Sequence, residues 1–274
     1  MSQTDLPSSL VLVGAGKMGG AMLQGWLALG LSPAAVSVLD PFASQDLIDL
    51  CAARGVALNQ PIASIAPPQV LVLAVKPQML DQAAPDIAPL VGAGTLIVSI
   101  MAGKTMGDIA ARLPAAAIVR AMPNTPAAVG RGVTGVAASA DVSPAQRAMA
   151  DALLRAIGRV EWVADEALID AVTAVSGSGP AYVFHLVEAL AAAGEKVGLP
   201  ADIAMRLARA TVEGSGELMF REPDVSAAQL RKNVTSPGGT TAAALEVLMA
   251  PDGLGELMGR AVSAARRRAE ELSG

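Results

Sequence analysis

Aromatic side chains are scarce in this sequence, in which phenylalanine, tyrosine and tryptophan together make up 2% of 274 residues. Hydrophobic residues of all kinds still make up 53%, which excludes a disordered chain because disorder requires low hydrophobicity. Much of that fraction is alanine, with valine and leucine, so small aliphatic side chains must fill the interior. Such a composition predicts closely packed helices and a slim sheet.

Cysteine and histidine occur once each, as Cys51 and His185. A single cysteine excludes an intrachain disulfide and a cysteine metal cluster, and we expect no metal site. A Ser-His-Asp triad would have to use His185, and no nucleophile elbow accompanies it. We therefore interpret His185 as a packing residue of an apolar helix.

Basic residues are fewer than acidic ones, which gives a net charge of −5 and argues against a nucleic-acid partner. The one basic run, residues 266–268, is interpreted as a solvated helix end. Apolar runs such as 70–75 are too short to span a membrane. The stretch from Met1 to Ser9 does not resemble a signal peptide. We expect a cytoplasmic protein without a membrane partner.

Short apolar runs alternate with helical patterns as far as Val163, which is typical of a parallel sheet buried on both faces. The pattern is almost wholly helical after that point. An α/β half followed by an all-α half indicates two domains, residues 1–163 and 164–274. The expected strands are 10–13, 36–39, 70–75, 95–99 and 118–121, with 132–136 and 159–163 as candidates; the expected helices include 18–29, 165–175, 181–197, 200–220, 226–232, 240–249 and 254–272.

The first expected strand runs into a G-x-G-x-x-G pattern, Gly14-Ala15-Gly16-Lys17-Met18-Gly19, which opens a helix. In this setting the first glycine permits a tight turn and the second lets a pyrophosphate approach the backbone. The third lets the helix pack on the strand. Free N–H groups at the helix start can then hold the phosphate charge. The pattern predicts a dinucleotide site.

Asp40 ends the second expected strand. A carboxylate there can accept hydrogen bonds from the adenosine ribose hydroxyls and would repel a 2′-phosphate. Residues 41–45 contain no arginine or lysine that could bind that phosphate. The sequence therefore favours NADH over NADPH; the alternative is that Asp40 only begins a turn with Pro41.

Five motifs resemble those of the pyrroline-5-carboxylate reductase family, occur in the order found in that family, and span nearly the whole chain. The resemblance implies a Rossmann domain followed by an all-α dimerisation domain. It also implies reduction of 1-pyrroline-5-carboxylate to L-proline by NADH or NADPH, in homodimers that in many members assemble into decamers. The motifs lie at 14–19, 74–77 (Ala-Val-Lys-Pro), 121–126 (Ala-Met-Pro-Asn-Thr-Pro), 176–182 (Ser-Gly-Ser-Gly-Pro-Ala-Tyr) and 235–241 (Thr-Ser-Pro-Gly-Gly-Thr-Thr), the last two being the most specific.

The resemblance also implies roles for single residues. The expected cofactor-binding residues are Gly14, Ala15, Gly16, Lys17, Met18, Gly19, Asp40, Asn59, Ala74, Val75, Lys76, Pro77, Ile100, Met101 and Ala102. The expected substrate-binding residues are Asn233, Ser236, Gly238, Gly239, Thr240 and Thr241. Loop N–H groups and a helix dipole there would cradle the substrate carboxylate, although a helix capped after a glycine turn would look similar.

Thr241 is the candidate catalytic residue, as the donor of a hydrogen bond to the ring nitrogen of the substrate. Whether it also transfers a proton stays open. The chain departs from the family pattern at Asp40, Met101, Ala167 and Lys232. These departures bear on cofactor preference and substrate contacts more than on the reaction.

Two kinds of alternative function remain. Another imine reductase or a β-hydroxyacid-dehydrogenase-like enzyme would share the glycine motif, but the latter resembles a pattern with a catalytic lysine just after a glycine-rich turn. Here Pro180 to His185 contains no lysine, and the next is Lys196. A non-catalytic dinucleotide sensor would lose the 235–241 segment, which is intact in this chain.

Overall fold

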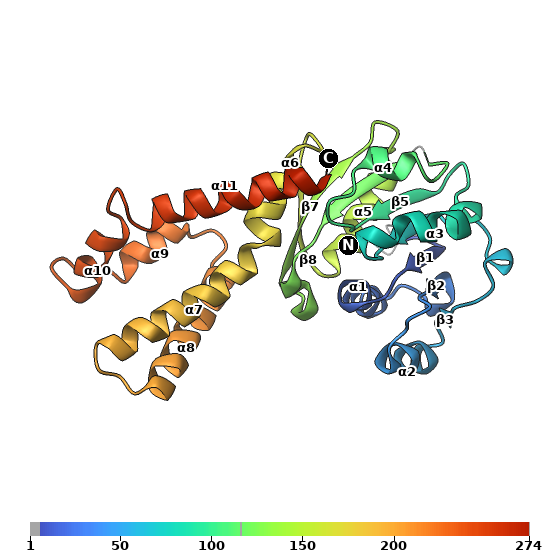
Figure 1. Ribbon diagram of the computed structural model, residues 1–274. Helices are drawn as coiled ribbons and strands as arrows, with labels where there is room; N and C mark the ends of the chain where they lie inside the picture. The colour runs from blue at the N-terminus through green and yellow to red at the C-terminus, as the bar shows by residue number, and fades with distance from the viewer. Residues whose placement is uncertain (1–5, 116, 274) are drawn as a thin grey trace. The chain divides into compact units, whose positions relative to one another are not determined.

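The computed structural model describes residues 6–115 and 117–273, so most of the N-terminal stretch from Met1 to Ser9 lies outside the described residues. The chain divides into two units (Figure 1). The sheet unit comprises Met1–Gly177 and Arg266–Gly274, and the helical unit comprises Ser178–Ala265. We describe each unit by itself.

The sheet unit is built on one eight-stranded sheet with the strand order β3-β2-β1-β4-β5-β6-β7-β8. Neighbours from β3 to β6 are parallel, β6 and β7 are antiparallel, and β7 and β8 are parallel again. The strands are β1 (Leu10–Val13), β2 (Val36–Leu39), β3 (Ala57–Leu58), β4 (Val70–Leu73), β5 (Leu96–Ser99), β6 (Ile118–Met122), β7 (Gly132–Ala138) and β8 (Gly158–Trp162).

Helices cover both faces of this sheet because successive strand residues point to opposite sides. Leu10 and Leu12 join a core with α1 (Lys17–Ala28), α2 (Gln45–Arg54) and α5 (Pro144–Arg155). Val11 and Val13 join a second core with α3 (Leu80–Ile87) and α4 (Met106–Ala110). The α/β architecture expected from the sequence is confirmed.

The expected strands are all present, and the structure adds β3 and reverses β7. The two residues of β3 are too few to leave a period in the sequence. A parallel β7 would need a crossover of a dozen or more residues, whereas the link from β6 contains only the short 3-10 turn Thr125–Val129. The reversal therefore follows from the length of the connection.

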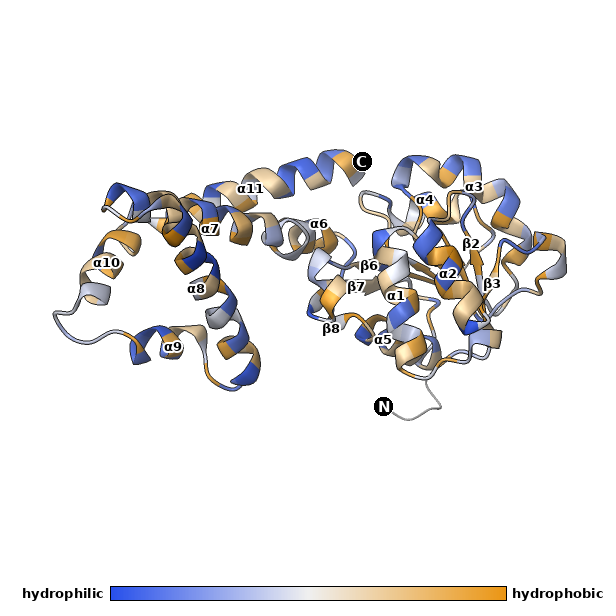
Figure 2. Ribbon diagram, turned by 90° about the horizontal axis from the view of Figure 1, so that it is seen from below, coloured by the Kyte–Doolittle hydropathy of each residue, from blue (hydrophilic) through white to orange (hydrophobic). Residues whose placement is uncertain are grey.

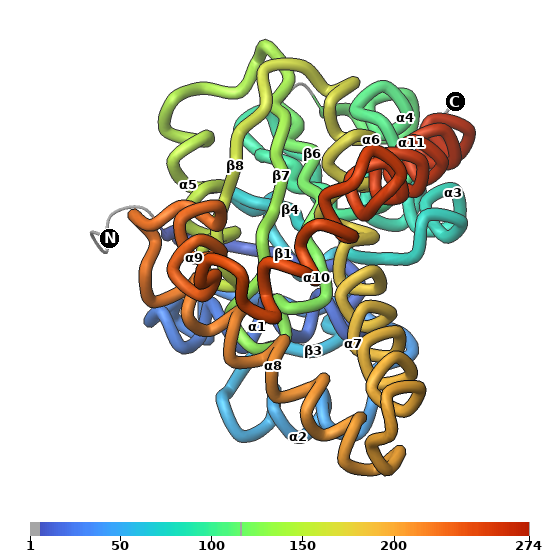
Figure 3. Tube along the Cα trace, turned by 90° about the vertical axis from the view of Figure 1, so that its left-hand side faces the viewer, coloured from blue at the N-terminus to red at the C-terminus, as the bar shows by residue number. Residues whose placement is uncertain are grey.

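The helical unit contains α7 (Gly179–Lys196), α8 (Ala201–Arg221), α9 (Ala227–Asn233) and α10 (Thr240–Leu248). It also contains most of α11 (Leu254–Ser273), whose last residues belong to the sheet unit. Helices α7 and α8 form a hairpin (Figure 3). Small residues allow their close approach, since a Cβ at Gly194 would lie 3.2 Å from the Cβ of Ala204.

The division into units differs from the boundary between residues 163 and 164 expected from the sequence. Helix α6 (Leu168–Val172) packs on β7, where a Cβ at Gly135 would lie 2.4 Å from Val172. The interval between the expected helices 165–175 and 181–197 is largely helical, because a π-helical turn, Thr173–Gly177, is followed by α7 from Gly179. In that turn the Thr173 hydroxyl donates to the Ile169 carbonyl at 2.8 Å, and the Ser176 hydroxyl donates to the Val172 carbonyl at 3.0 Å.

A buried guanidinium joins three elements within the sheet unit. Arg120 of β6, 3% exposed, lies 3.1 Å from a Glu166 oxygen and 3.5 Å from an Asp170 oxygen. The hydroxyl of Ser273, at the end of α11, donates to Asp170 at 2.9 Å. Glu166 also accepts the Met106 N–H at 2.7 Å. One side chain thus joins β6, the start of α6 and the end of α11.

The helices of the helical unit carry many exposed apolar side chains, and Figure 2 colours hydrophobic positions on α7, α8 and α10 orange. Phe184 and Leu207, for example, are 64% and 52% exposed. No helix within the described residues has both the length and the apolar character needed to cross a membrane.

Candidate active site

The glycine-rich turn after β1 needs glycine at two positions for reasons internal to the protein. Gly14 has φ +83°, and a Cβ there would lie 2.8 Å from the Ala74 carbonyl oxygen. A Cβ at Gly19 would lie 2.4 Å from the Gly14 carbonyl oxygen. Neither clash can be relieved by moving a side chain, because both partners are backbone atoms. These two glycines shape the turn and bring α1 against it.

Gly16 is different, because nothing in the protein requires a glycine there. Its φ of −62° and ψ of −161° are open to other residues, and a Cβ would have no atom within 4 Å. The space beside it is therefore free for a ligand that approaches the backbone. Gly16 is also the N-cap of α1, and among the described residues no side chain caps that helix. Its first N–H groups can therefore meet an anion, so the site fits a dinucleotide pyrophosphate.

Asp40 lies beside this turn, at the end of β2. Its Oδ2 accepts the Ala15 N–H at 2.8 Å, and its Oδ1 accepts the Phe42 N–H at 2.9 Å. The carboxylate is thus held by two backbone amides, and each oxygen keeps a lone pair for a ribose hydroxyl. The turn alternative raised by the sequence is also present, since Asp40 bonds within the loop that it begins. The two roles are compatible.

Asn59 fixes the backbone of Asp40. Its Oδ1 accepts the Asp40 N–H at 2.8 Å and its Nδ2 donates to the Asp40 carbonyl at 2.8 Å. Its φ is +52°, in the left-handed region that asparagine tolerates better than most residues. The amide that the sequence assigned to the cofactor therefore bonds to the backbone of Asp40.

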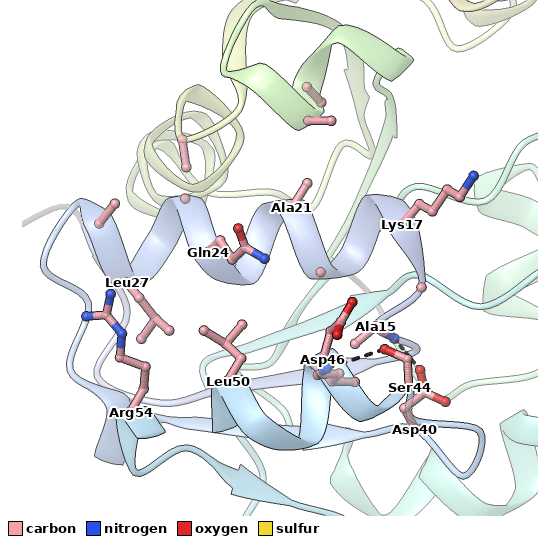
Figure 4. Close-up of a pocket in the computed structure, with 18 of the residues that line it drawn as sticks. Ala15, Lys17, Ala21, Gln24, Leu27, Asp40, Ser44, Asp46, Leu50 and Arg54 are labelled. Carbon is pink, nitrogen blue, oxygen red and sulfur yellow. Dashed lines mark hydrogen bonds between the residues drawn. The ribbon is translucent and has the colours of Figure 1, made fainter. Parts of the chain in front are cut away.

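A groove of about 840 Å³ runs between α1 and α2 (Figure 4). Asp40, Ser44 and Asp46 lie at one end of it, and Arg54 lies at the other. The ammonium of Lys17 points away from Asp40. Sequence reasoning missed Asp46, which occupies the first turn of α2 after the N-cap Ser44. The Ser44 hydroxyl accepts the Leu47 N–H at 3.3 Å and so caps this helix. A serine at this position is the sequence signal that could have located the start of the helix.

The remaining expected cofactor residues follow β4 and β5, whose carboxyl ends lie at the same edge of the sheet as that of β1. Lys76 is exposed and begins a 3-10 turn at Pro77, after the half-buried Ala74 and Val75. After β5, Ile100 is half-buried and Ala102 exposed. Met101 is only 3% exposed and packs in the second core, so its backbone rather than its side chain can face the cofactor.

The expected substrate residues share one loop of the helical unit. Asn233 ends α9 and accepts a hydrogen bond from Gln229 at 2.7 Å. Gly238 has φ +66°, which turns the chain, and the Gly239 N–H donates to the Ser236 carbonyl at 3.1 Å. Gly239 is the N-cap of α10, and no side chain within the described residues caps this helix. The Thr240 and Thr241 side chains follow at its first turn, where an anion would be favoured.

His185 lies outside both of these sites. Its ring is 79% exposed in the single chain, and Nδ1 lies 2.9 Å from Glu188, so it packs on no core within the chain and its interpretation as a packing residue stays a prediction. The apolar face of α7 is open to solvent in the single chain, which a helical pattern does not reveal. Among the described residues, no group of three or more histidine, cysteine, aspartate or glutamate side chains is placed to hold a metal ion.

In this site, a glycine-rich turn connects a parallel strand to a helix without a side-chain cap, and a carboxylate follows the next strand. This arrangement is typical of dinucleotide-binding oxidoreductases. Residues 9–103 match the family described as NADP oxidoreductase, coenzyme F420-dependent. Residues 166–272 match the family described as pyrroline-5-carboxylate reductase dimerisation.

Relatives that match nearly the whole chain identify the family. A pyrroline-5-carboxylate reductase of Pseudomonas aeruginosa is 40% identical over 272 residues, which are 96% of each chain. A structure of that enzyme from Coxiella burnetii has a TM-score of 0.89 at 37% identity, over 97% of this chain and 99% of the other. The Plasmodium falciparum pyrroline carboxylate reductase, solved with NADP bound, has a TM-score of 0.77 at 27% identity, over 97% and 98%. The chain belongs to the pyrroline-5-carboxylate reductase family.

Proposed function

We propose that this protein reduces 1-pyrroline-5-carboxylate to L-proline with a reduced nicotinamide dinucleotide. The observation that carries the cofactor part of the proposal is the turn at Gly16, which begins the uncapped helix α1 and leaves open space beside its backbone for a pyrophosphate. Family membership and the intact 235–241 loop support the choice of substrate. The other imine reductases and the dinucleotide sensor are alternatives that the assay below distinguishes.

In this proposal the residues of the chain bind and orient the cofactor and the substrate, and none of them attacks the substrate as a nucleophile. When bound, the reduced nicotinamide supplies a hydride to the carbon of the C=N bond, which is electrophilic once the ring nitrogen is protonated. The α1 N–H groups and helix dipole hold the pyrophosphate, and Asp40 holds the ribose. Ser236, Gly238 and Thr240 take the substrate carboxylate, while Gly239, whose N–H donates to the Ser236 carbonyl, shapes the loop. Thr241 hydrogen-bonds to the ring nitrogen and is the residue that we assign to catalysis.

The decisive experiment is NADH oxidation measured with and without 1-pyrroline-5-carboxylate, with the product identified by chromatography. We expect turnover only with the imine, and L-proline as the product. Binding of NADH without turnover would instead indicate a sensor. Turnover of other cyclic imines alone would indicate a different imine reductase.

We further propose that NADH is the preferred reductant. Asp40 accepts from the ribose hydroxyls, and charge-assisted bonds of this kind contribute about 1.5–3 kcal/mol each. A 2′-phosphate would meet the negative charges of Asp40 and Asp46, while Arg54 lies at the far end of the groove and Lys17 points away.

The test of this preference is kcat/KM for both cofactors in the wild type and in Asp40→Ser. The substitution should shift the ratio of kcat/KM for NADH to kcat/KM for NADPH by roughly 10-fold or more toward NADPH. A 10-fold shift corresponds to about 1.4 kcal/mol of interaction energy. Asp49→Ser is the matched control, because Asp49 lies on the same helix as Asp46 and pairs with Gln45. A wild type that prefers NADPH, with a ratio indifferent to Asp40→Ser, would refute this proposal.

We infer that the working form is an intertwined homodimer, with a pentamer of such dimers as the larger assembly. The exposed apolar faces of α7 and α8 and the match to a dimerisation family support self-association. The acidic net charge of −5 fits a cytoplasmic enzyme without a nucleic-acid partner. Light scattering at micromolar concentration should give a multiple of the 27.5 kDa chain mass.

A further inference from the structure

Three aromatic residues lie in the sheet unit, and two of them are fully used in packing. Trp26 is 0% exposed, and its indole N–H donates to the Leu153 carbonyl at 2.9 Å. Trp162 donates to Asp151 at 3.0 Å, and the Arg147 guanidinium lies 3.8 Å from the centre of its ring. Phe42 is the exception, at 81% exposed. The ring of Phe42 is therefore free to contact a ligand, and Phe42 is one of the residues that line the groove between α1 and α2.

The place of Phe42 indicates which ligand. It lines the same groove as Gly16 and Asp40. Its backbone N–H is held by Asp40 Oδ1 at 2.9 Å, so the ring is carried by the loop that presents the ribose-binding carboxylate. Asp40 and Phe42 are two positions apart, so their Cα atoms are at most about 7 Å apart. A ribose hydroxyl and the base on the same sugar are separated by a similar distance.

We propose that Phe42 is the platform on which the adenine ring of the cofactor stacks. The proposal rests on the assignment of a nicotinamide dinucleotide to this groove. A flat aromatic ring suits the adenine because bases stack on aromatic side chains through their π-faces. Asp40 then has two roles, as it accepts from the ribose hydroxyl and holds the backbone of the residue that covers the base.

Binding of 5′-AMP is the first test, because this ligand contains the adenosine end and no reacting atoms. Removal of a stacking ring weakens base binding by about 5- to 100-fold, so isothermal titration should show that loss for 5′-AMP with Phe42→Ala. Phe42→Tyr should restore wild-type affinity, and Phe42→Leu, apolar but not flat, should not. Ile48→Ala is the matched control, because Ile48 is 40% exposed in the same unit and lies outside the residues that line the groove.

A fluorescent variant gives a readout independent of turnover. The indole of Phe42→Trp should be quenched by 5′-AMP and by ADP-ribose. It should not respond to reduced nicotinamide mononucleotide, which has no adenine. In kinetics, Phe42→Ala should raise KM for NADH by about 5- to 100-fold and leave kcat within 2-fold.

The outcomes separate this inference from the proposed function. If the enzyme forms L-proline but Phe42→Ala binds 5′-AMP as the wild type does, the platform is wrong and the function stands. If no imine is reduced but 5′-AMP binding depends on the ring at position 42, the platform stands and the function fails. A change in oligomer mass with Phe42→Ala, at unchanged 5′-AMP affinity, would assign the ring to a protein contact and overturn the platform.

Discussion

The two units of this chain bury their apolar side chains to very different degrees. In the sheet unit, Trp26, Met22 and Leu71 are completely buried, on two faces of one sheet. Within the described residues of the helical unit, the buried side chains are those of Ala191, Ala204 and Ala208. A set of helices that buries three methyl groups has no core of its own, because apolar area removed from water is the main stabilising term. The sheet unit thus has a core of its own, whereas the exposed apolar side chains of the helical unit fit burial against a second copy of the chain.

The largest expected effect comes from placing a charge on the exposed apolar surface of the helical unit. Phe184 is 64% exposed in the single chain, and Phe184→Glu should weaken self-association by about 2–4 kcal/mol, as for the central residues of an interface. Light scattering should then show masses that fall toward 27.5 kDa on dilution.

Phe42→Glu is the control for that substitution, because Phe42 is 81% exposed in the sheet unit. The mass of the Phe42 variant should not change. Equal effects of the two glutamates on the mass would show that exposure of apolar rings does not distinguish the units.

The second comparison concerns charge pairs. Arg120 is buried between Glu166 and Asp170, so Arg120→Ala leaves two acids without their partner and should lower the free energy of unfolding by about 3–5 kcal/mol. Arg209 pairs with Glu213 at 2.7 Å in the helical unit but is 73% exposed. Arg209→Ala should cost less than about 1 kcal/mol. Urea unfolding followed by circular dichroism measures both values, and a similar cost for the two would remove the role assigned to Arg120.

The smallest effect concerns the acid limit of the sheet unit. Partial burial opposes ionisation of Asp108, but hydrogen bonds from the Thr105 N–H and hydroxyl, with the charges of Lys104 and Arg112, outweigh it and lower its pKa. A pKa that is lower when folded gives stability that is complete above the unfolded value near 4 and is lost as the pH falls through the folded value.

Asp108→Asn should therefore remove up to about 1 kcal/mol at pH 7, as for a lost helix cap. It should remove progressively less below pH 4. Thermal unfolding at pH 7 and pH 3 measures the difference. A destabilisation of equal size at both pH values would mean that the charge of Asp108 contributes nothing.

The sequence predicted most of the sheet unit because its signals are local. Most of the strands are short apolar runs, and Gly19 is required by the carbonyl of Gly14, which lies in the same short motif. The direction of β7 was not predicted, because it depends on the length of the link after β6. The bonds of Asp40 to Ala15 and to Asn59 join segments that are distant in sequence, and no pattern indicates them.

The helical unit was predicted less completely, for a different reason. Its helices and the 235–241 loop follow from periodicity and motif, and they are present. The exposure of His185 and Phe184 was not predicted, because an apolar stripe on a helix indicates that it is covered but not by which chain. The hydrogen bond from Ser273, at the end of α11, to Asp170 joins residues distant in sequence, and no local pattern indicates it.

We propose that the sheet unit selects the cofactor and that the helical unit binds the imine. The direct test measures NADH affinity, the NADH to NADPH ratio and kcat in Asp40→Ser and in Thr241→Ala. Asp40→Ser should change the affinity and the ratio. Thr241→Ala should lower kcat by roughly 10- to 1,000-fold, as for a lost transition-state hydrogen bond, and leave NADH affinity unchanged. A Thr241→Ala variant that weakens NADH binding at unchanged kcat would contradict the account.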